Sequence, residues 1–181
     1  METINTVNRK WSRAEVAELL VSKTALTEMK MEHALQVVRL LAPQRVPAGS
    51  VLIAEGVTNT GFMALVLSGE AIVVNESSRS GNDDSVMLSQ LRCGNVFGEL
   101  GVLDGKPRSA TVTAITDMDI AVLDRPALAR LIDTVPGVAC ALLGAIMERV
   151  AQRLRATNAK VKALSASNQA LRDELDALKA K

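Results

Sequence analysis

Short apolar segments, separated by glycines and polar turns, fill the middle of the chain. They occupy residues 51–54, 63–67, 71–74, 86–91, 111–115 and 119–123. Segments of this length are typical of strands, because a helix needs a longer stretch of apolar residues at its own spacing. Several short strands at intervals of roughly ten residues predict a small antiparallel sandwich, jelly roll or barrel.

Helices are expected before the strands. Ser12, followed three residues later by Glu15, is a capping-box pattern and predicts a short helix that ends near Val21. Apolar residues at helical spacing predict a second helix over residues 27–41, which Pro43 would end.

Two further helices are expected after the strands. Pro126 suits the first turn of a short hinge helix that ends near Ile132, with Asp124 or Arg125 as its N-cap. Pro136 then begins a helix that no later proline interrupts, so we expect it to continue almost to the end of the sequence.

Length and composition favour one domain with a helical extension. A chain of 181 residues can form one substantial core but not two full domains. We expect N-terminal helices over residues 1–43, a β domain with the hinge helix over residues 44–135, and a long helix over residues 136–181. The net charge of +1 gives no overall attraction to nucleic acid or to an anionic membrane. No apolar stretch approaches the ~20 residues that span a bilayer, and the N-terminus is polar, so a cytoplasmic protein is expected.

The cysteines and the histidine predict neither a metal site nor an active site. Cys93 and Cys140 have no neighbouring ligand pattern, and we expect both to be buried thiols. His33 has no serine or cysteine nucleophile arranged around it. We therefore expect no enzyme activity, no metal and no cofactor.

A heptad repeat begins at Met147 in the long helix. Its first core position holds Met147, Leu154, Val161, Asn168 and Leu175, and its second holds Val150, Thr157, Leu164, Leu171 and Leu178. Leucine at the second position and one asparagine at the first are typical of parallel two-stranded coiled coils. Glu174 and Lys179 flank this seam at a spacing that allows an interchain salt bridge. We expect a homodimer; a helix packed on its own domain or paired with another protein is the alternative.

Residues 94–112 carry the residue types that a phosphate site needs. Gly98 would let the backbone approach a ligand, and residues 99–103 can form one helical turn whose free amides face outward. Arg108 begins an apolar strand, where a guanidinium needs an anionic partner. A phosphate on Arg108, with Glu99 accepting a hydroxyl, would suit a nucleotide with a cyclic phosphate. The same residues would also fit a buried Glu99–Arg108 ion pair that only stabilises the sheet.

Two runs of residues in this segment resemble a known family. Residues 97–101, FGELG, and residues 107–112, PRSATV, are similar to the phosphate-binding cassette of the cyclic nucleotide-binding domain family. The resemblance extends over roughly residues 28–160 and implies a mainly β (α+β) fold, an eight-stranded antiparallel β jelly roll with flanking helices. Within the family, residues 153–158, RLRATN, resemble the bacterial cyclic-AMP receptor (Crp/Fnr) type.

The resemblance also implies roles for individual residues. Glu99 would bind the ribose 2′-hydroxyl and Arg108 the cyclic phosphate, with Ser109 adding hydroxyl and amide contacts. Gly98 and Leu100 would contribute backbone contacts to the ligand.

Two differences separate the chain from the receptor type. Thr157 and Asn158 match residues that read the base, but the helix over residues 136–157 is about one turn longer, which would move Thr157 away from the base. The receptor type continues into a helix-turn-helix domain, whereas this sequence continues its helix, so no direct DNA binding is expected.

The sequence therefore predicts a non-catalytic sensor of cyclic AMP, or of cyclic GMP, that signals to an effector protein through its dimeric helix. The ligand would order the cassette and reposition the hinge helix. Two alternatives stay open: a ligand-free interaction scaffold with a vestigial cassette, and a transcription regulator that acts through another DNA-binding partner.

Overall fold

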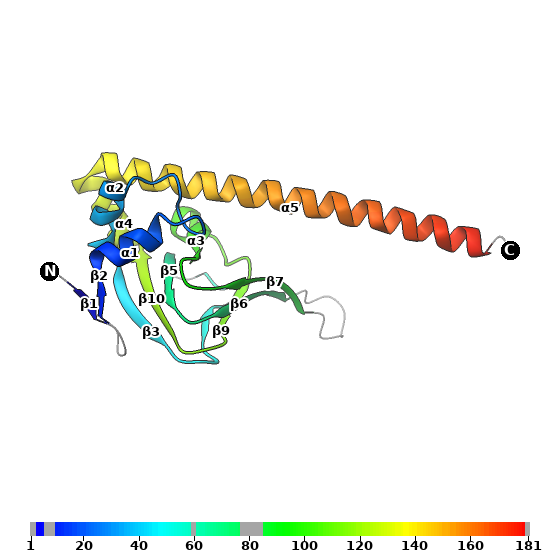
Figure 1. The fold of residues 1–181 in the computed structure, drawn as a ribbon, viewed down its shortest axis with the longest axis horizontal. Coiled ribbons are helices and arrows are strands. Elements are labelled where there is room, and N and C mark those ends of the chain that lie inside the picture. The colour runs from blue at the N-terminus through cyan, green and yellow to red at the C-terminus, as the bar shows by residue number, and fades with distance from the viewer. Residues whose placement is uncertain (1–2, 6–9, 59–60, 77–84, 180–181) are drawn as a thin grey trace. The chain divides into compact units, whose positions relative to one another are not determined.

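The computed structural model describes residues 3–5, 10–58, 61–76 and 85–179. The chain divides into two compact units, Met1–Ile146 and Met147–Lys181. In the described part of the first unit, eight strands form two four-stranded sheets, with the orders β3-β10-β5-β8 and β4-β9-β6-β7 (Figure 1). Every pairing within these sheets is antiparallel. The predicted eight-stranded jelly roll is therefore confirmed.

Most of the strands match the apolar segments of the sequence. The first sheet contains β3 (Ala42–Val46), β10 (Met118–Asp124), β5 (Phe62–Ser68) and β8 (Val96–Phe97), and the second contains β4 (Val51–Ile53), β9 (Thr111–Ala114), β6 (Ala71–Glu76) and β7 (Ser85–Leu91). A separate hairpin joins β1 (Thr3–Asn5) to β2 (Lys10–Ser12). The sequence does not predict β3 or β8, because β3 lacks apolar alternation and β8 has only two residues.

Both sheets contribute side chains to one hydrophobic core. Its members include Val46, Val66, Phe97 and Ile120 from the first sheet and Ile53, Val73 and Val112 from the second. Phe97 is buried in this cluster, and Phe62 packs against the cluster. The core therefore fixes the point at which the cassette begins.

The first helix, α1 (Arg13–Leu20), begins at the predicted capping box. Ser12 N donates to Glu15 Oε2 at 2.7 Å, and Glu15 N donates to Ser12 Oγ at 3.2 Å. These two bonds satisfy amides that the helix itself leaves unpaired.

The second helix, α2 (Met31–Val38), is shorter than the predicted range 27–41. The residues before it form turns, as in the hydrogen bond from Met29 N to Leu26 O. Leu26 and Met29 are buried, so their apolar character reflects the packing of these turns. Pro43 lies inside β3 rather than at the end of the helix.

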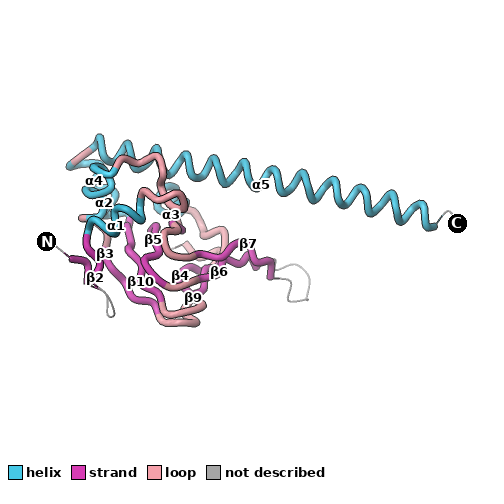
Figure 2. Tube along the Cα trace, viewed as in Figure 1, coloured by secondary structure: helices cyan, strands magenta, loops and turns pink. Residues whose placement is uncertain are grey.

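The hinge helix is α4 (Arg125–Thr134), and it begins as predicted. Asp124 Oδ1 accepts a hydrogen bond from Ala127 N at 2.7 Å, and Pro126 lies in the first turn. In the view of Figure 2, α1, α2 and α4 lie toward one end of the strands.

The last helix, α5 (Pro136–Lys179), begins at the predicted proline. Within the first unit it buries Val138, Ala139, Leu142, Ala145 and Ile146. The second unit is the rest of this helix, and its side chains are exposed from residue 152 to residue 179. The predicted boundaries after residues 43 and 135 stay predictions.

The expectation of buried thiols is wrong. Cys93 and Cys140 are both exposed, and Cys93 Sγ donates to Leu67 O at 3.0 Å. Sequence alone favoured burial because an unpaired cysteine is usually a small core residue. Among the described residues, no helix is long and apolar enough to cross a membrane.

Candidate functional site

The predicted helical turn of the cassette is α3 (Glu99–Asp104), which follows β8. Gly98, its N-cap, has a φ of 76°, and Gly105, its C-cap, has a φ of 64°. Residues with a side chain seldom adopt this left-handed backbone conformation, whereas glycine does so at little cost. Glycines therefore define both ends of α3.

Arg108 ties α3 to the start of β5. The residue is buried, with 8% of its surface exposed. Its Nη1 donates to Gly98 O at 2.9 Å and its Nη2 donates to Phe62 O at 3.2 Å. The guanidinium carbon also lies 4.8 Å from the centroid of the Phe62 ring, within the range of a cation–π contact.

Opposing electrostatic effects act on this guanidinium. Burial lowers the pKa of Arg108, while the negative charges of Glu99 and Asp104 raise it. Arginine stays protonated under such conditions because its ordinary pKa is so high. Glu99 is itself buried, with 2% of its surface exposed. The cassette therefore holds a permanent cation near a buried carboxyl group.

Glycines bring the backbone into contact with the cation. A Cβ atom at Gly101 would overlap Arg108 Nη1, and one at Gly98 would meet Phe62 O at 2.7 Å. A Cβ atom at Gly61 would overlap the carbonyl oxygen of Gly101. The backbone of α3 at Gly101 therefore contacts both the guanidinium and Gly61, the residue that precedes β5.

A turn at residues 55–56 and the strand β6 support the segment around Arg108. Gly56 N donates to Arg108 O at 2.9 Å. Asn75 Nδ2 donates to Ser109 O at 3.3 Å and to Glu55 Oε1 at 3.2 Å. The Ser109 side chain is exposed. Main-chain and side-chain bonds thus hold this segment while Ser109 stays accessible.

The cassette also contacts the start of the hinge helix α4. Phe62 is paired in the sheet with Asp124, the N-cap of α4. Arg125 N donates to Gly61 O at 3.2 Å. At the other end of α3, a Cβ atom at Gly105 would overlap the Arg125 guanidinium. The cassette therefore touches Arg125 directly at Gly105, and Phe62, which accepts from Arg108, pairs with the cap of α4.

The structure brings most of the predicted ligand residues together, namely Gly98, Glu99, Leu100, Arg108 and Ser109. Thr157 and Asn158 belong to α5 in the second unit, where their side chains are exposed. Their role at the base stays a prediction.

Sequence reasoning missed several residues of the site: Glu55, Gly61, Phe62 and Asn75. They come from strands or turns far from the cassette in sequence, and no spacing pattern connects them to it. Phe62 alone carried a signal, because the chain has very few aromatic residues.

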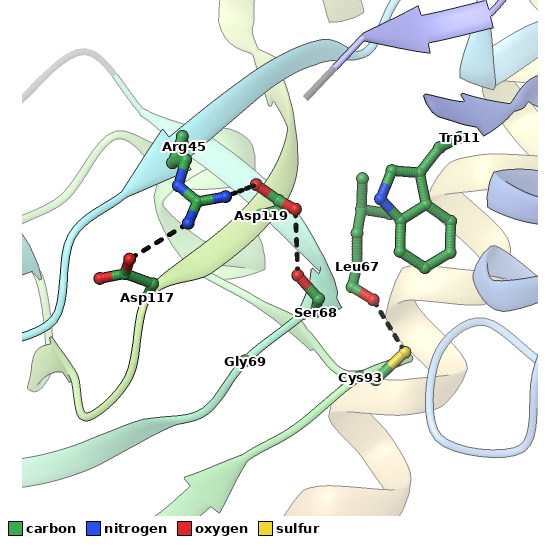
Figure 3. Close-up of a pocket in the computed structure, with 8 residues that line it drawn as sticks. All are labelled: Trp11, Arg45, Leu67, Ser68, Gly69, Cys93, Asp117 and Asp119. Atoms are coloured by element: carbon green, nitrogen blue, oxygen red, sulfur yellow. Dashed lines mark hydrogen bonds and ion pairs between the residues drawn. The ribbon is translucent and has the colours of Figure 1, made fainter. Parts of the chain in front are cut away.

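A separate cavity of about 650 Å³ lies elsewhere in the first unit (Figure 3). It is lined by Trp11, Arg45, Leu67, Ser68, Gly69, Cys93, Asp117 and Asp119. None of these residues belongs to the cassette, so the cavity is distinct from the predicted site.

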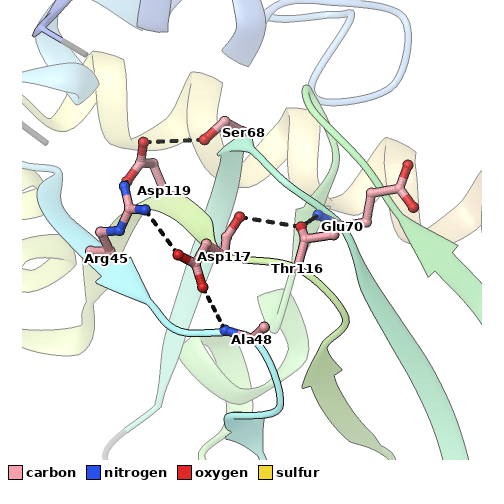
Figure 4. A network of polar contacts seen from close by, with 7 residues as sticks. All are labelled: Arg45, Ala48, Ser68, Glu70, Thr116, Asp117 and Asp119. Carbon is pink, nitrogen blue, oxygen red and sulfur yellow. Dashed lines mark hydrogen bonds and ion pairs between the residues drawn. The ribbon is translucent and has the colours of Figure 1, made fainter. Parts of the chain in front are cut away.

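An ionic network forms part of the wall of this cavity (Figure 4). Arg45 Nη2 lies 3.1 Å from Asp117 Oδ2, and Arg45 Nη1 lies 3.5 Å from Asp119 Oδ1. Ser68 Oγ donates to Asp119 Oδ2 at 3.1 Å. The hydrogen bond from Ala48 N, followed by that from Arg45, holds the pKa of Asp117 below its usual value. These bonds join β3, β10 and β5, which is a structural role.

The structure offers no metal centre within the described residues: no group of three His, Cys, Asp or Glu side chains is placed to hold an ion. His33 lies on α2, with its Nε2 3.7 Å from Glu32 Oε1.

Comparison with known proteins bears on both the fold and the cassette. The family described as "Cyclic nucleotide-binding domain" matches residues 43–135, just over half of the 181 residues. The chain is 34% identical over 113 residues to the cAMP-dependent protein kinase regulatory subunit of Aspergillus niger, which covers 62% of this chain and 26% of that protein. The chain thus spans about a quarter of the length of the curated relatives it matches.

Solved structures show the same fold. A cyclic nucleotide-binding domain from Methylobacillus flagellatus KT has a TM-score of 0.67 and 24% identity, over 79% of this chain and 78% of that chain. The Thermus thermophilus Catabolite Activator Protein has a TM-score of 0.62 and 25% identity, over 81% of this chain and 63% of that chain. On the family match, the jelly roll and the cassette, the chain belongs to the cyclic nucleotide-binding domain family.

Proposed function

We propose that this chain is a non-catalytic cyclic-nucleotide sensor whose output passes through its long C-terminal helix. The observation that carries the proposal is the buried guanidinium of Arg108, held between Gly98 and Phe62 with Glu99 nearby. A donor fork beside a carboxyl group suits a ligand that has both a phosphate and a hydroxyl. Membership of the family supports the same conclusion.

Arg108 would exchange its acceptors when the phosphate binds. Its recorded partners, Gly98 O and Phe62 O, are neutral carbonyl oxygens. A phosphate carries a full negative charge and can accept two parallel hydrogen bonds from the guanidinium fork, so it is a better acceptor for Arg108 than two separate carbonyl oxygens. Glu99 would then accept from the ribose 2′-hydroxyl, and Ser109 would donate its hydroxyl and amide to the phosphate.

Cyclic AMP is the proposed ligand, with cyclic GMP as the alternative. Curated relatives at 34% identity are named as regulatory subunits of a cAMP-dependent protein kinase, which favours cyclic AMP. Ser109 can donate to the phosphate of either nucleotide. Gly98 and Leu100 would add backbone contacts, and Thr157 and Asn158 would contact the base.

The second unit is proposed to form a parallel coiled-coil homodimer. Its seam side chains are between 52 and 67% exposed at Met147, Leu154, Val161, Leu164, Leu171, Leu175 and Leu178. Val150, Thr157 and Asn168 occupy the remaining seam positions, and Asn168 would pair with its copy and fix the register. Nucleotide binding would move α4 and change how the long helices pack. An effector protein would recognise this change.

The hydrogen bonds of Arg108 also favour a second candidate, an interaction scaffold that binds no nucleotide. In that case Arg108 would serve only to tie Gly98 to Phe62. The buried position of the guanidinium fits such a structural role as well.

Isothermal titration of the full chain with cyclic AMP and cyclic GMP separates the two candidates. Heat of binding with either nucleotide supports the sensor and ranks the ligands. Folded protein that shows neither heat nor a shift in melting temperature with either nucleotide contradicts it. An Arg108→Ala variant that stays folded but loses nucleotide affinity would contradict the scaffold.

A further inference from the structure

The second unit has a face on which charges of opposite sign lie at opposite ends. We label the heptad a to g, with the seam at a and d; positions c and f then lie opposite the seam, flanked by b and g. We call positions b, c, f and g of residues 152–177 the outer face. Its flanks hold Arg153, Arg155, Lys160 and Lys162 in the first half, and Glu174 and Asp176 in the second. All of these side chains are exposed.

Small residues lie between the charged flanks. Positions c and f hold Ala156, Ala159, Ala163, Ala166, Ala170 and Ala177, with Gln152 in the first half and a further acidic residue, Asp173, in the second. Short side chains let another helix approach closely, since the distance between helix axes depends on the side chains at the contact. The alanines permit a contact along this face, and the charges determine its partner.

We propose that the outer face binds the outer face of a second copy of this chain in an antiparallel arrangement. Arg155 then faces Asp176 of the partner subunit, and Arg153 faces Glu174 of the partner subunit. The twofold symmetry of such a contact repeats both pairs. A parallel arrangement would instead place Arg155 beside its own copy, where like charges repel.

In one register, no charged side chain on the flanks of this face meets a like charge. It is the register in which Ala163 faces Ala166 of the partner subunit. Lys160 then faces Ser167 of the partner subunit, and Lys162 faces Gln169 of the partner subunit, both of which can accept a hydrogen bond. No two like charges face each other over this length of about 39 Å. The charges of this face are therefore complementary to those of a second copy that runs antiparallel to it.

A polyanion such as duplex DNA is the competing partner for the cations. It would leave Glu174 and Asp176, on the same face, opposite phosphate groups of like charge. A second copy of the chain pairs with both the positive and the negative side chains of this face, and we therefore favour it as the partner.

The contact should be weak and sensitive to salt. Arg155 Nη2 already lies 3.6 Å from Glu148 Oε1 in its own helix, and both side chains are exposed, so a new pair partly replaces an existing one. Exposed ion pairs contribute little each, and salt screens them. Because positions b, c and f point away from the seam and only position g borders it, the outer face can join coiled-coil dimers into tetramers, and it does not depend on nucleotide binding.

Sedimentation equilibrium of the full chain, at low and high salt, tests the proposal with Arg155→Glu and Asp176→Lys. Both residues occupy position b, away from the seam. Each variant alone should weaken the association beyond the dimer by about tenfold or more, because like charges now meet. An equimolar mixture of the two should restore it, because the new acidic side chain of one variant faces the new basic side chain of the other.

Matched controls change the same net charge elsewhere. Lys23→Glu and Glu28→Lys alter exposed residues between α1 and α2 and should leave the association unchanged. Wild-type protein without a salt-sensitive step beyond the dimer overturns the proposal, and so does a mixture that fails to recover that step. Binding of a DNA duplex that Arg155→Glu abolishes, in protein that does not self-associate, assigns the face to a polyanion instead.

Discussion

The guanidinium of Arg108 packs against the backbone of Gly101 so closely that a Cβ atom on Gly101 would overlap Nη1. Gly101 is not among the glycines with positive φ, so its backbone conformation does not itself require glycine. The three atoms nearest to an added Cβ atom all belong to the Arg108 guanidinium, so the contact with this side chain favours glycine at this position.

A methyl side chain at position 101 should therefore disturb the cassette. We expect Gly101→Ala to lower the affinity for cyclic nucleotide by about tenfold or more and to destabilise the fold by about 1–3 kcal/mol, as overpacking does. Titration calorimetry and urea unfolding measure the two effects. Gly144→Ala in α5 is the control, since nothing lies within 4 Å of its added Cβ atom. It should stabilise the helix by about 0.5–1 kcal/mol. Wild-type affinity in Gly101→Ala would show that Arg108 does not hold the ligand.

Nucleotide affinity should depend more on the planar, two-donor geometry of the Arg108 guanidinium than on its charge. Arg108→Lys keeps a positive charge but cannot span Gly98 O and Phe62 O as a planar guanidinium does. We expect nucleotide affinity to fall by about 10- to 100-fold, with the fold retained. Ser109→Ala, which removes one hydroxyl donor, should cost about tenfold or less. Calorimetric titration of both variants checks the order, and an equal loss in the two would argue against a phosphate held by the fork.

Glu99 and the ribose 2′-hydroxyl should act as a pair. Wild-type protein should prefer cyclic AMP over 2′-deoxy-cyclic AMP by about tenfold, because a buried acceptor otherwise loses its donor. In Glu99→Ala this preference should disappear, even if both affinities fall. Competition binding with the two nucleotides gives the coupling directly. If the preference for cyclic AMP survives the substitution, a residue other than Glu99 binds the ribose 2′-hydroxyl.

Acid should weaken the network at Asp117. Its pKa is held below the usual value by Ala48 N and Arg45, so its contribution to stability is present above the unfolded pKa, about 3.9. That contribution is lost as the pH falls through the lower folded value. The difference in unfolding free energy between wild type and Asp117→Asn should therefore shrink as the pH falls below about 4. Urea unfolding across this range measures it, with Asp133→Asn, an exposed site on α4, as the control. A difference that does not change with pH would contradict the assignment.

Asn168 should determine how many helices the coiled coil contains. We expect Asn168→Val to raise the thermal stability of the dimer and to add higher oligomers, because a buried polar pair no longer selects two strands. Light scattering after size exclusion measures the mass, and Ser165→Val, beside the seam, is the control. If the wild-type protein is monomeric at all concentrations, the proposal of a coiled-coil dimer is contradicted.

The cassette can be predicted from sequence because its parts lie close together in the chain. Gly98, Glu99 and Arg108 are separated by ten residues or fewer, and burial of Phe97 places them at the edge of the core. The partners of Arg108 could not be predicted in the same way. Its acceptor on Phe62 is a main-chain oxygen from a strand far earlier in the sequence, and a carbonyl leaves no trace in residue type.

The errors in the helices and thiols have physical causes as well. The second helix is shorter than predicted because the residues before Met31 form turns, in which Met29 N bonds to Leu26 O. Cys93 was expected inside, but its exposed thiol bonds to Leu67 O instead. Local pattern thus identified the elements with regular spacing, whereas turns and single exposed residues depended on tertiary contacts.

The pairing of Phe62 with Asp124 gives the cassette and the hinge helix a shared piece of backbone. Phe62 O accepts a hydrogen bond from Arg108, and Gly61 O accepts one from Arg125 N, the first amide of α4. Neighbouring strands lie only about 4.8 Å apart, so no long relay of side chains is needed. A connection made of peptide groups depends little on side chains, except at Gly61, where the approach of Gly101 O leaves no room for one. Relatives of this chain could therefore diverge in sequence at the other positions and still inherit the same link between ligand and hinge.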